Sequence, residues 1–214
     1  MITRLAIAFA ACLPLLAGPP LPRVESVTTE KTDLAPGGTI RIEGSTGELN
    51  VEGWDEPSVE VTVTRYTWDA NEEHGRRELK KVQVSKPVVQ GREFTLTTTH
   101  KRTLGVYTDY RIRVPRNSKL VIHHHTGDVT VYDVAGDIDA SASVGEILVQ
   151  VPASAQYAID AKSKSTGEIF TDFPGRSHYN RLLMGDSLET EAPAPAHRLH
   201  LRVGVGGISI QKVG

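Results

Sequence analysis

The chain has 214 residues, enough for one domain with a sizeable core, and its 24 basic and 26 acidic residues give a net charge of −2. A dedicated nucleic-acid-binding surface is usually strongly basic, so this balance argues against a nucleic acid as the partner. Aromatic residues make up only 6% of the chain. Valine, isoleucine and threonine are plentiful and no window keeps a helical period, which predicts an all-β protein.

Residues 1–17 form an apolar run with one charge, Arg4. The run is too short to span a bilayer with ease, and it predicts a secretory signal peptide that is cleaved after Ala17; a buried N-terminal segment is the alternative. A proline-rich lead-in follows over residues 18–23, and a single domain over residues 24–214. The sequence therefore predicts an exported protein, located in the periplasm, at the cell surface or outside the cell.

Cys12 lies within this leader and is the only cysteine. If the leader is removed, the mature protein has no thiol and no disulfide, so packing alone must stabilise it. The small residues Ala10 and Ala11 before it resemble a bacterial lipoprotein processing site, although Phe9 stands where a branched aliphatic residue is usual. Membrane attachment would therefore require lipidation of Cys12.

Alternating polar and apolar residues predict the strands. They fall at residues 39–43, 59–66, 82–84, 93–99, 107–114 and 198–203. The charged stretch over residues 71–81 favours a solvated loop over a short helix. Residues 173–196, which are rich in proline and glycine, predict an irregular excursion. Residues 204–213 predict the terminal coil of the fold, and no segment that would cap this coil is evident.

A short sequence motif recurs along the chain, in which a turn glycine is followed by a short alternating strand. Its most complete form is Thr126-Gly127-Asp128-Val129-Thr130-Val131, and its copies are spaced by multiples of roughly 20 residues, as in repeat proteins. Glycine supplies the positive φ that a sharp corner needs. The predicted structural corners are Gly47, Gly127, Gly136, Gly145, Gly167 and Gly207. A coil of this length cannot bury its apolar face alone, so we predict a short β-solenoid of stacked coils.

Three stretches, Gly53-Trp54-Asp55, Tyr110-Arg111-Ile112-Arg113-Val114-Pro115 and Thr126-Gly127-Asp128-Val129, resemble the bacterial putative-adhesin family of uncharacterised β-solenoid domains. The resemblance covers roughly residues 24–214 and departs from the family pattern over residues 173–196. It implies an exported or membrane-attached protein. We predict no cofactor, and a protein or glycan of the cell envelope as the partner.

Acidic residues follow most of the corner glycines. They are Glu48, Asp128, Asp137, Glu146 and Glu168. In stacked coils such carboxylates would lie about 4.8 Å apart, and a divalent cation would relieve their repulsion. The calcium-binding nonapeptide repeat needs paired glycines and an aspartate in every repeat, whereas only two nine-residue steps occur here, each with a single glycine. Carboxylates at exposed turns more often accept backbone N–H groups or point into solvent, and we prefer that interpretation.

The run His123-His124-His125 offers a second candidate for metal binding. On a strand, His123 and His125 share one face while His124 faces the other way, so a site with two imidazoles is sterically feasible. Asp128 and His200 are the candidate third ligands, but the sequence positions neither of them. We prefer a polar strand face with one partly buried histidine, and therefore predict no metal.

Two further sets of charged residues could support chemistry or binding. The acidic set, which resembles the carboxylates of β-helix enzymes that act on polysaccharides, is Asp133, Asp137, Asp139 and Glu146. The chain is too short to build the long groove of such enzymes, so we predict no catalytic residue. The basic set, which could meet anionic glycans or lipid headgroups, is Arg111, Arg113, Arg116, Lys119, Arg198 and Arg202. Polar strand faces are the preferred interpretation of this set.

The sequence therefore predicts a noncatalytic, exported, adhesin-like β-solenoid that presents a binding surface in the cell envelope. A structural or scaffold domain that self-associates through its edge strands is the alternative. A carbohydrate-active enzyme is a third hypothesis.

Overall fold

The computed structural model describes residues 21–100, 105–180, 184–190 and 195–214, and in these residues the protein is all-β apart from one short helix. The predicted signal peptide, Cys12 and most of the lead-in lie outside them. No helix in the described part of the chain is long and apolar enough to cross a membrane.

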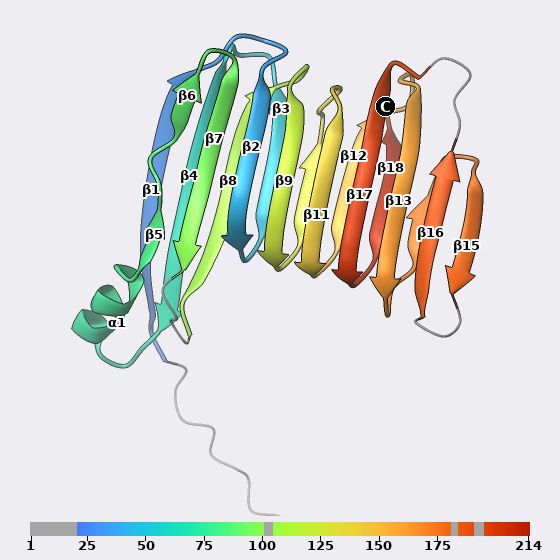
Figure 1. Cartoon of the computed structure of the whole chain (residues 1–214). Coiled ribbons are helices and arrows are strands. Elements are labelled where there is room, and N and C mark those ends of the chain that lie inside the picture. Colours follow the sequence, from blue (N-terminus) through green and yellow to red (C-terminus); the bar gives the residue numbers. More distant parts are fainter. Residues whose placement is uncertain (1–20, 101–104, 181–183, 191–194) are drawn as a thin grey trace, which may run out of the picture.

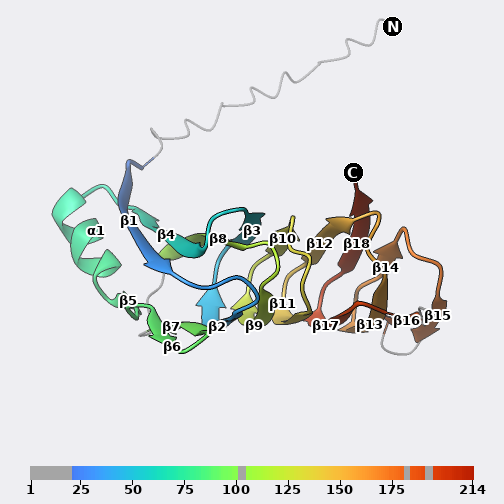
Figure 2. The same cartoon turned by 90° about the horizontal axis from the view of Figure 1, so that it is seen from above.

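Two sheets lie face to face and enclose the core (Figures 1 and 2). The eight-stranded sheet contains, in spatial order, β1 (Arg23–Asp33), β4 (Ser58–Trp68), β8 (Tyr107–Pro115), β3 (Leu49–Trp54), β10 (Val129–Tyr132), β12 (Ile147–Pro152), β18 (Ile208–Val213) and β14 (Ile169–Thr171). The ten-stranded sheet contains β15 (Arg176–Asn180), β16 (Gly185–Thr190), β13 (Tyr157–Ser165), β17 (His197–Val205), β11 (Ile138–Val144), β9 (Lys119–Thr126), β2 (Thr39–Thr46), β7 (Glu93–His100) and β5 (Val82–Val84), with β6 (Val88–Gln90) paired to β7.

The middle of each sheet is parallel because the chain passes repeatedly from a strand of the ten-stranded sheet into a strand of the eight-stranded sheet. These paired-strand units stack in the spatial order β7–β8, β2–β3, β9–β10, β11–β12, β17–β18 and β13–β14. Neighbouring units pair in parallel in both sheets. The first unit of the chain, β2–β3, and the last, β17–β18, are therefore both internal to the stack.

This order corrects the expectation that residues 204–213 form the terminal coil. Strand β18 lies between β12 and β14, and its Ile208 and Ile210 are paired with neighbours on both sides. Both isoleucines are almost completely buried. Insertion into the stack buries an apolar strand that would otherwise have one free edge.

Glycines line up at the corners of the stacked units. A β-carbon on Gly127 would lie 2.2 Å from the carbonyl oxygen of Gly47, and one on Gly145 would lie 2.0 Å from that of Gly127. The same contact recurs from Gly206 to Gly145 at 1.9 Å and from Gly167 to Gly206 at 1.8 Å. No L side chain fits at such a distance, so the column requires glycine in every layer from Gly127 to Gly167.

Only some of the predicted corners have positive φ. Gly47, Gly127 and Gly145 have φ of 110°, 115° and 135°. Gly136, Gly167 and Gly207 are not among the residues with positive φ, and in their units it is Thr166 and Gly206 that adopt it. Gly136 and Gly167 are instead required by close backbone approach, since a β-carbon on Gly136 would lie 2.1 Å from the carbonyl oxygen of Ser118.

Antiparallel strands cover both ends of the parallel stack. At one end β4 and β1 continue the eight-stranded sheet, and β5 and β6 pair with β7. At the other end β16 and β15 extend the ten-stranded sheet beyond β13. The prediction of an irregular excursion over residues 173–196 is wrong for residues 176–180 and 185–190, which form the paired strands β15 and β16. Residues 181–183 and 191–194 lie outside the described part.

Residues 71–81, predicted as a loop, contain helix α1 (Glu72–Leu79). The Asn71 side chain caps the helix by accepting the backbone N–H of His74 at 3.0 Å. Acidic residues occupy the first turn and basic residues the last, which suits the helix dipole. Gly75 and Leu79 are buried, and Gly75 lies against Val24 of β1. Tertiary packing therefore stabilises a helix where the charge pattern favoured a loop.

The core lies between the two sheets and is aliphatic. Its largest fully buried side chains are Tyr110, Phe94, Ile40, Ile42, Leu49, Leu96, Ile112, Leu120, Ile122, Ile138, Ile147 and Ile159. They alternate with partly exposed or exposed residues along most strands. One face of each sheet is therefore buried, and the other is available to solvent.

Candidate binding surface

The acidic residues after the corners form part of a column, and two of them, Asp128 and Asp137, accept backbone N–H groups. Asp128 accepts the backbone N–H of Glu146 through Oδ1 at 2.9 Å. At the equivalent position between two other strands of the sheet, Asp109 accepts the backbone N–H of Glu48 through Oδ1 at 3.4 Å. Gly207 interrupts the column between Glu146 and Glu168, because β18 is inserted there.

The predicted metal candidates are not brought together. His123 and His125 are exposed on β9, whereas His124 is buried. His123 Nδ1 lies 2.9 Å from a carboxylate oxygen of Glu43, while Asp128 binds the backbone of the next unit. Within the described residues, no three histidine, cysteine, aspartate or glutamate side chains are grouped as a metal site.

The four carboxylates considered for polysaccharide hydrolysis do not all lie together. Asp137 and Glu146 flank opposite ends of β11, on the order of 20 Å apart along the strand. Asp133 lies 3.3 Å from a guanidinium nitrogen of Arg116, and Asp137 accepts the backbone N–H of Arg198. A pair of carboxyls for glycoside hydrolysis must lie within roughly 10 Å, so Asp137 and Glu146 do not form one.

The basic set is divided between the two sheets. Arg111 and Arg113 lie on the eight-stranded sheet and share the carboxylate of Glu52 at 3.2 and 3.3 Å. Arg202 lies on the ten-stranded sheet and pairs with Asp160. These residues therefore do not form one basic patch.

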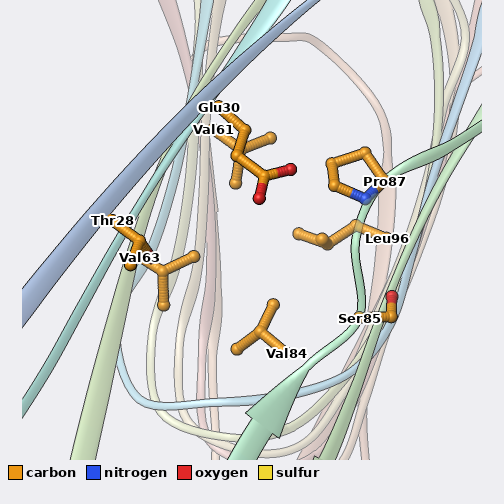
Figure 3. A pocket seen from close by; sticks show the side chains of 8 residues that line it. All are labelled: Thr28, Glu30, Val61, Val63, Val84, Ser85, Pro87 and Leu96. Carbon is orange, nitrogen blue, oxygen red and sulfur yellow. The ribbon is translucent and has the colours of Figure 1, made fainter.

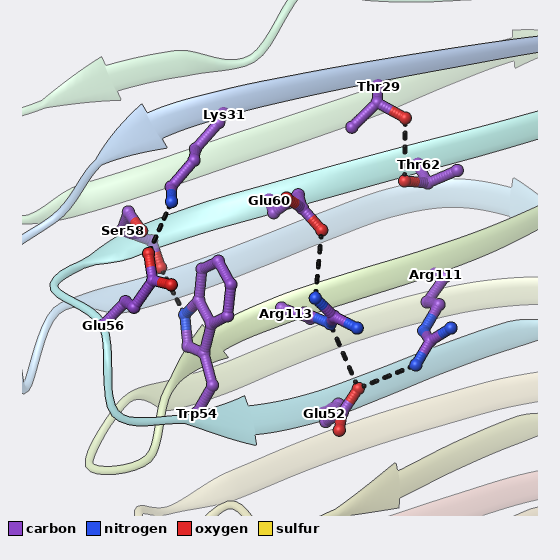
Figure 4. A network of polar contacts seen from close by, with 10 residues as sticks. All are labelled: Thr29, Lys31, Glu52, Trp54, Glu56, Ser58, Glu60, Thr62, Arg111 and Arg113. Carbon is purple, nitrogen blue, oxygen red and sulfur yellow. Dashed lines mark hydrogen bonds and ion pairs between the residues drawn. The ribbon is translucent and has the colours of Figure 1, made fainter.

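The outer face of the eight-stranded sheet carries a band of polar contacts (Figure 4). Arg113 bridges Glu52 on β3 and Glu60 on β4, at 3.3 and 3.5 Å. The hydroxyls of Thr29 and Thr62 lie 3.0 Å apart across β1 and β4. These cross-strand contacts link four strands and hold the face in one arrangement.

An exposed aromatic cluster lies at one end of this face. The rings of Tyr66 and Tyr107, directly opposite each other on β4 and β8, stack with centroids 5.4 Å apart. Trp68 contacts both rings edge-on, at 5.2 and 5.4 Å, and the Arg23 guanidinium lies 4.1 Å from the Tyr66 ring. Trp68 is 48% exposed and Tyr107 is 49% exposed, so large ring surfaces remain open to solvent.

A second aromatic side chain, Trp54, lies toward the other end of the face. Its indole N–H donates to the carbonyl of Ser58 at 2.8 Å, and the cationic groups of Lys31 and Arg113 lie 5.0 and 5.6 Å from its rings. Trp54 is paired with the last residue of β8, whereas Tyr107 is the first, so the two aromatic positions are roughly 26 Å apart along the strands.

A cleft also opens between β1 and β4 on one side and the β5 to β7 region on the other (Figure 3). Val61, Val63 and Leu96 line it together with the carboxylate of Glu30. Its volume is about 40 Å³, against several hundred for an ordinary ligand pocket. The cleft is therefore too small for an organic ligand.

The aromatic cluster was not predicted from the sequence. Tyr66 ends the strand predicted over residues 59–66 and Trp68 follows two residues later, so an extension of that strand by two residues places both on one face. Tyr107 is 39 residues beyond Trp68 in the chain, and only the β4–β8 register brings it opposite Tyr66. The two-residue spacing of Tyr66 and Trp68 could have indicated that they share a face. The position of Tyr107 beside them could be known only from the order of the strands.

The fold and this surface define an all-β, two-sheet protein with an exposed aromatic and charged face. The sequence matches no protein-family model, and no curated protein matches it. Similar solved structures include a "putative cell adhesion protein" from Clostridium sporogenes, with 13% identity, 88% of this chain and 100% of that chain covered, and a TM-score of 0.49.

Two others have lower scores. They are a "putative adhesin" from Bacteroides fragilis, with 10% identity, 86% and 97% coverage and a TM-score of 0.26, and a "putative lipid binding protein" from Parabacteroides distasonis, with 10% identity, 88% and 97% coverage and a TM-score of 0.27. At these scores the likeness assigns neither fold nor function, so the function is argued from the protein's own residues.

Proposed function

We propose that this protein is a noncatalytic, exported, adhesin-like domain that binds a glycan through the outer face of its eight-stranded sheet. The exposed cluster of Tyr66, Trp68 and Tyr107 carries the proposal. Monomeric proteins seldom leave three large rings together at the surface, and such patches are typical of interaction sites.

The chemistry of the cluster suits a saccharide. The C–H face of a sugar ring is apolar and stacks on an aromatic ring, while its hydroxyls need polar partners at the rim. Arg23 supplies donors beside Tyr66, and Asp109 and Thr64 lie in the neighbouring rows of the same face. The rings contact one another, so little side-chain entropy would be lost on binding.

The polar band and Trp54 extend this surface along the strands. Arg111 is exposed and Arg113 partly exposed, and both have donors for ligand hydroxyls beyond those used by Glu52. A linear oligosaccharide lying along β4 and β8 would meet the cluster first, then the arginines, then Trp54. The wide spacing favours an extended ligand over a single sugar.

The supporting architecture belongs to the same proposal. We infer that the paired-strand units make a short β-solenoid-like stack, whose glycine column keeps the layers in register. A rigid sheet holds aromatic anchors better than loops do. Export rests on the leader predicted over residues 1–17, and the absence of catalysis rests on the dispersed carboxylates, of which Asp137 and Glu146 are the clearest case.

A saccharide array followed by titration tests this proposal. We expect binding of the full chain to at least one linear oligosaccharide, and a loss of roughly tenfold or more in affinity with Trp68→Ala or Tyr107→Ala. Phe170→Ala is the matched control, because Phe170 is also an exposed aromatic residue, 64% exposed, on β14 of the same sheet. Retention of full affinity in both cluster variants would contradict the proposal.

Catalysis can be checked in the same assay. Any bound oligosaccharide should be recovered uncleaved. If turnover is detected and Asp137→Ala together with Asp139→Ala abolishes it, the protein is an enzyme and the noncatalytic assignment fails.

Self-association through an edge strand is a second candidate function. Strand β1 has eleven residues and is hydrogen-bonded only to β4 within the described part of the chain. Val27 on it is 54% exposed, and long exposed edges favour pairing between chains. Sedimentation at increasing concentration should then show a dimer that Val27→Lys removes.

A further inference from the structure

A row of cationic and hydroxyl side chains crosses the outer face of the ten-stranded sheet, on the side of the molecule opposite the aromatic cluster (Figures 1 and 2). Each member is paired in register with the next, from β11 through β17, β13 and β16 to β15. This cationic row consists of Ser141, Arg202, Lys162, Ser187 and His178. Adjacent strands are about 4.8 Å apart, so the row is roughly 19 Å long.

The row opens into a hollow at the β13–β15 end. The hollow has a volume of about 340 Å³, and Lys162, Lys164, His178 and Ser187 are among the residues that line it. Gly185 of β16 also lines the hollow and lies close to the β13 backbone, since a β-carbon there would lie 2.6 Å from the carbonyl oxygen of Lys164. A concave, hydroxyl-bearing site with two ammonium groups is thus formed on an otherwise pleated face.

The charges in the hollow are available to a ligand. Lys162 and Lys164 are exposed, and in the part of the chain that the structure describes neither makes an ion pair. The one carboxylate among the lining residues, Asp186, accepts the backbone N–H groups of Ile169 and Ser187 at 3.1 and 2.7 Å. Its oxygens are therefore already engaged with the fold.

Arg202 is fixed at the middle of the row. One of its terminal nitrogens donates to the Asp160 and Leu201 carbonyl oxygens at 2.8 and 3.0 Å, and the other pairs with the Asp160 carboxylate. These contacts orient the guanidinium on the sheet, so its two remaining N–H donors can meet a ligand without further ordering.

We infer that the cationic row binds a linear acidic polysaccharide. The next row on the same face runs from Asp139 through His200, Asp160 and Glu189 to Arg176, so three carboxylates lie beside the cationic row. A flat anionic membrane would press against both rows and be repelled by these acids, whereas a single chain can follow the cationic row alone. Uronate carboxylates would meet Lys162, Lys164 and Arg202, and sugar hydroxyls would meet Ser141 and Ser187. This site is independent of the proposed glycan surface on the eight-stranded sheet.

Fluorescence anisotropy with a labelled linear oligogalacturonate tests the inference on the full chain. We expect binding at low ionic strength that weakens several-fold between about 50 and 300 mM salt, because the contacts are ionic and exposed. Lys162→Gln should weaken binding about threefold, and Lys162→Gln combined with Lys164→Gln about tenfold. Lys119→Gln removes the same charge from the same face outside the row and should leave affinity unchanged.

Other outcomes would overturn the inference. If the double variant binds as tightly as the unaltered protein and has the same thermal midpoint, the cationic row is not the binding site. A lack of oligogalacturonate binding would do the same. Tighter binding to anionic phospholipid vesicles or to a single-stranded oligonucleotide would reassign the row to that ligand. Trp68→Ala separates the two surfaces, since it should not affect oligogalacturonate binding.

Discussion

A β-carbon on Gly127 would lie 2.2 Å from the carbonyl oxygen of Gly47, the glycine at the same corner of the neighbouring unit. This contact is one step of a column that continues through Gly145, Gly206 and Gly167. Because the layers are hydrogen-bonded in both sheets, the backbone cannot move away to admit a side chain at one corner without breaking the pairing of several strands.

Close approach, more than positive φ, makes the column intolerant of substitution. We expect Gly167→Ala, where φ is not positive, and Gly127→Ala, where it is, each to lower the free energy of unfolding by roughly 3 kcal/mol or more. Gly91→Ala should cost only about 1 kcal/mol, because Gly91 has a φ of +61° but no atom near its β-carbon position. Urea denaturation measures all three, and an equal cost for Gly91→Ala and Gly167→Ala would refute this explanation.

His124 should make stability depend on pH. Burial lowers the pKa of His124 from its ordinary value of 6.5, although backbone hydrogen bonds oppose the shift. The unfolded chain therefore binds the proton more tightly, so stability is fully present above about pH 6.5 and falls as the pH drops below it. Thermal midpoints measured from pH 8 to pH 5 check this expectation.

The adjacent histidine supplies the control for this pH effect. His124→Gln should flatten the curve in this window, whereas His125→Gln, at an exposed position on β9, should leave it unchanged. The lowered pKa values of Asp69 and Asp160 act at lower pH, because both start from an ordinary value of 3.8. A pH dependence that persists in His124→Gln would point to other groups.

Two buried tyrosines should respond oppositely to removal of the hydroxyl. Burial raises the pKa of both Tyr110 and Tyr157 to about 12. The Tyr110 hydroxyl donates to Thr98 at 3.0 Å, whereas that of Tyr157 has no partner among the described residues. We expect Tyr110→Phe to cost about 1 kcal/mol and Tyr157→Phe to be neutral or stabilising in chemical denaturation. Equal losses in the two variants would contradict this prediction.

The C-terminal strand should be among the most protected parts of the fold. Strand β18 is hydrogen-bonded to β12 and β14, although it contains the last described residues of the chain. Amide hydrogen exchange at Ile208 and Ile210 should therefore require global unfolding, whereas β15, at the free edge of the ten-stranded sheet, should exchange sooner. Fast exchange at both isoleucines would contradict the insertion of β18 into the stack.

The sequence alone determined the local structure of this protein. Alternation predicted the strands at residues 39–43, 59–66 and 107–114, since every second residue of a half-buried strand faces the core and is apolar. It also placed His124 inside and His123 outside. Charge pattern could not decide helix α1, because Gly75 and Leu79 depend on contacts with other elements.

Only the tertiary structure decided the order of the strands. Parallel strands are joined by long connections, and no local sequence pattern identifies their partners. Nothing in residues 204–213 therefore indicates that β18 lies between β12 and β14. Pairing between strands that are far apart in the sequence also hid the meeting of Tyr66 with Tyr107, across the antiparallel strands β4 and β8, and the row that joins Arg202 to Lys162. Each of these sites is made of residues from different strands, and such residues become neighbours only when the register between the strands is fixed.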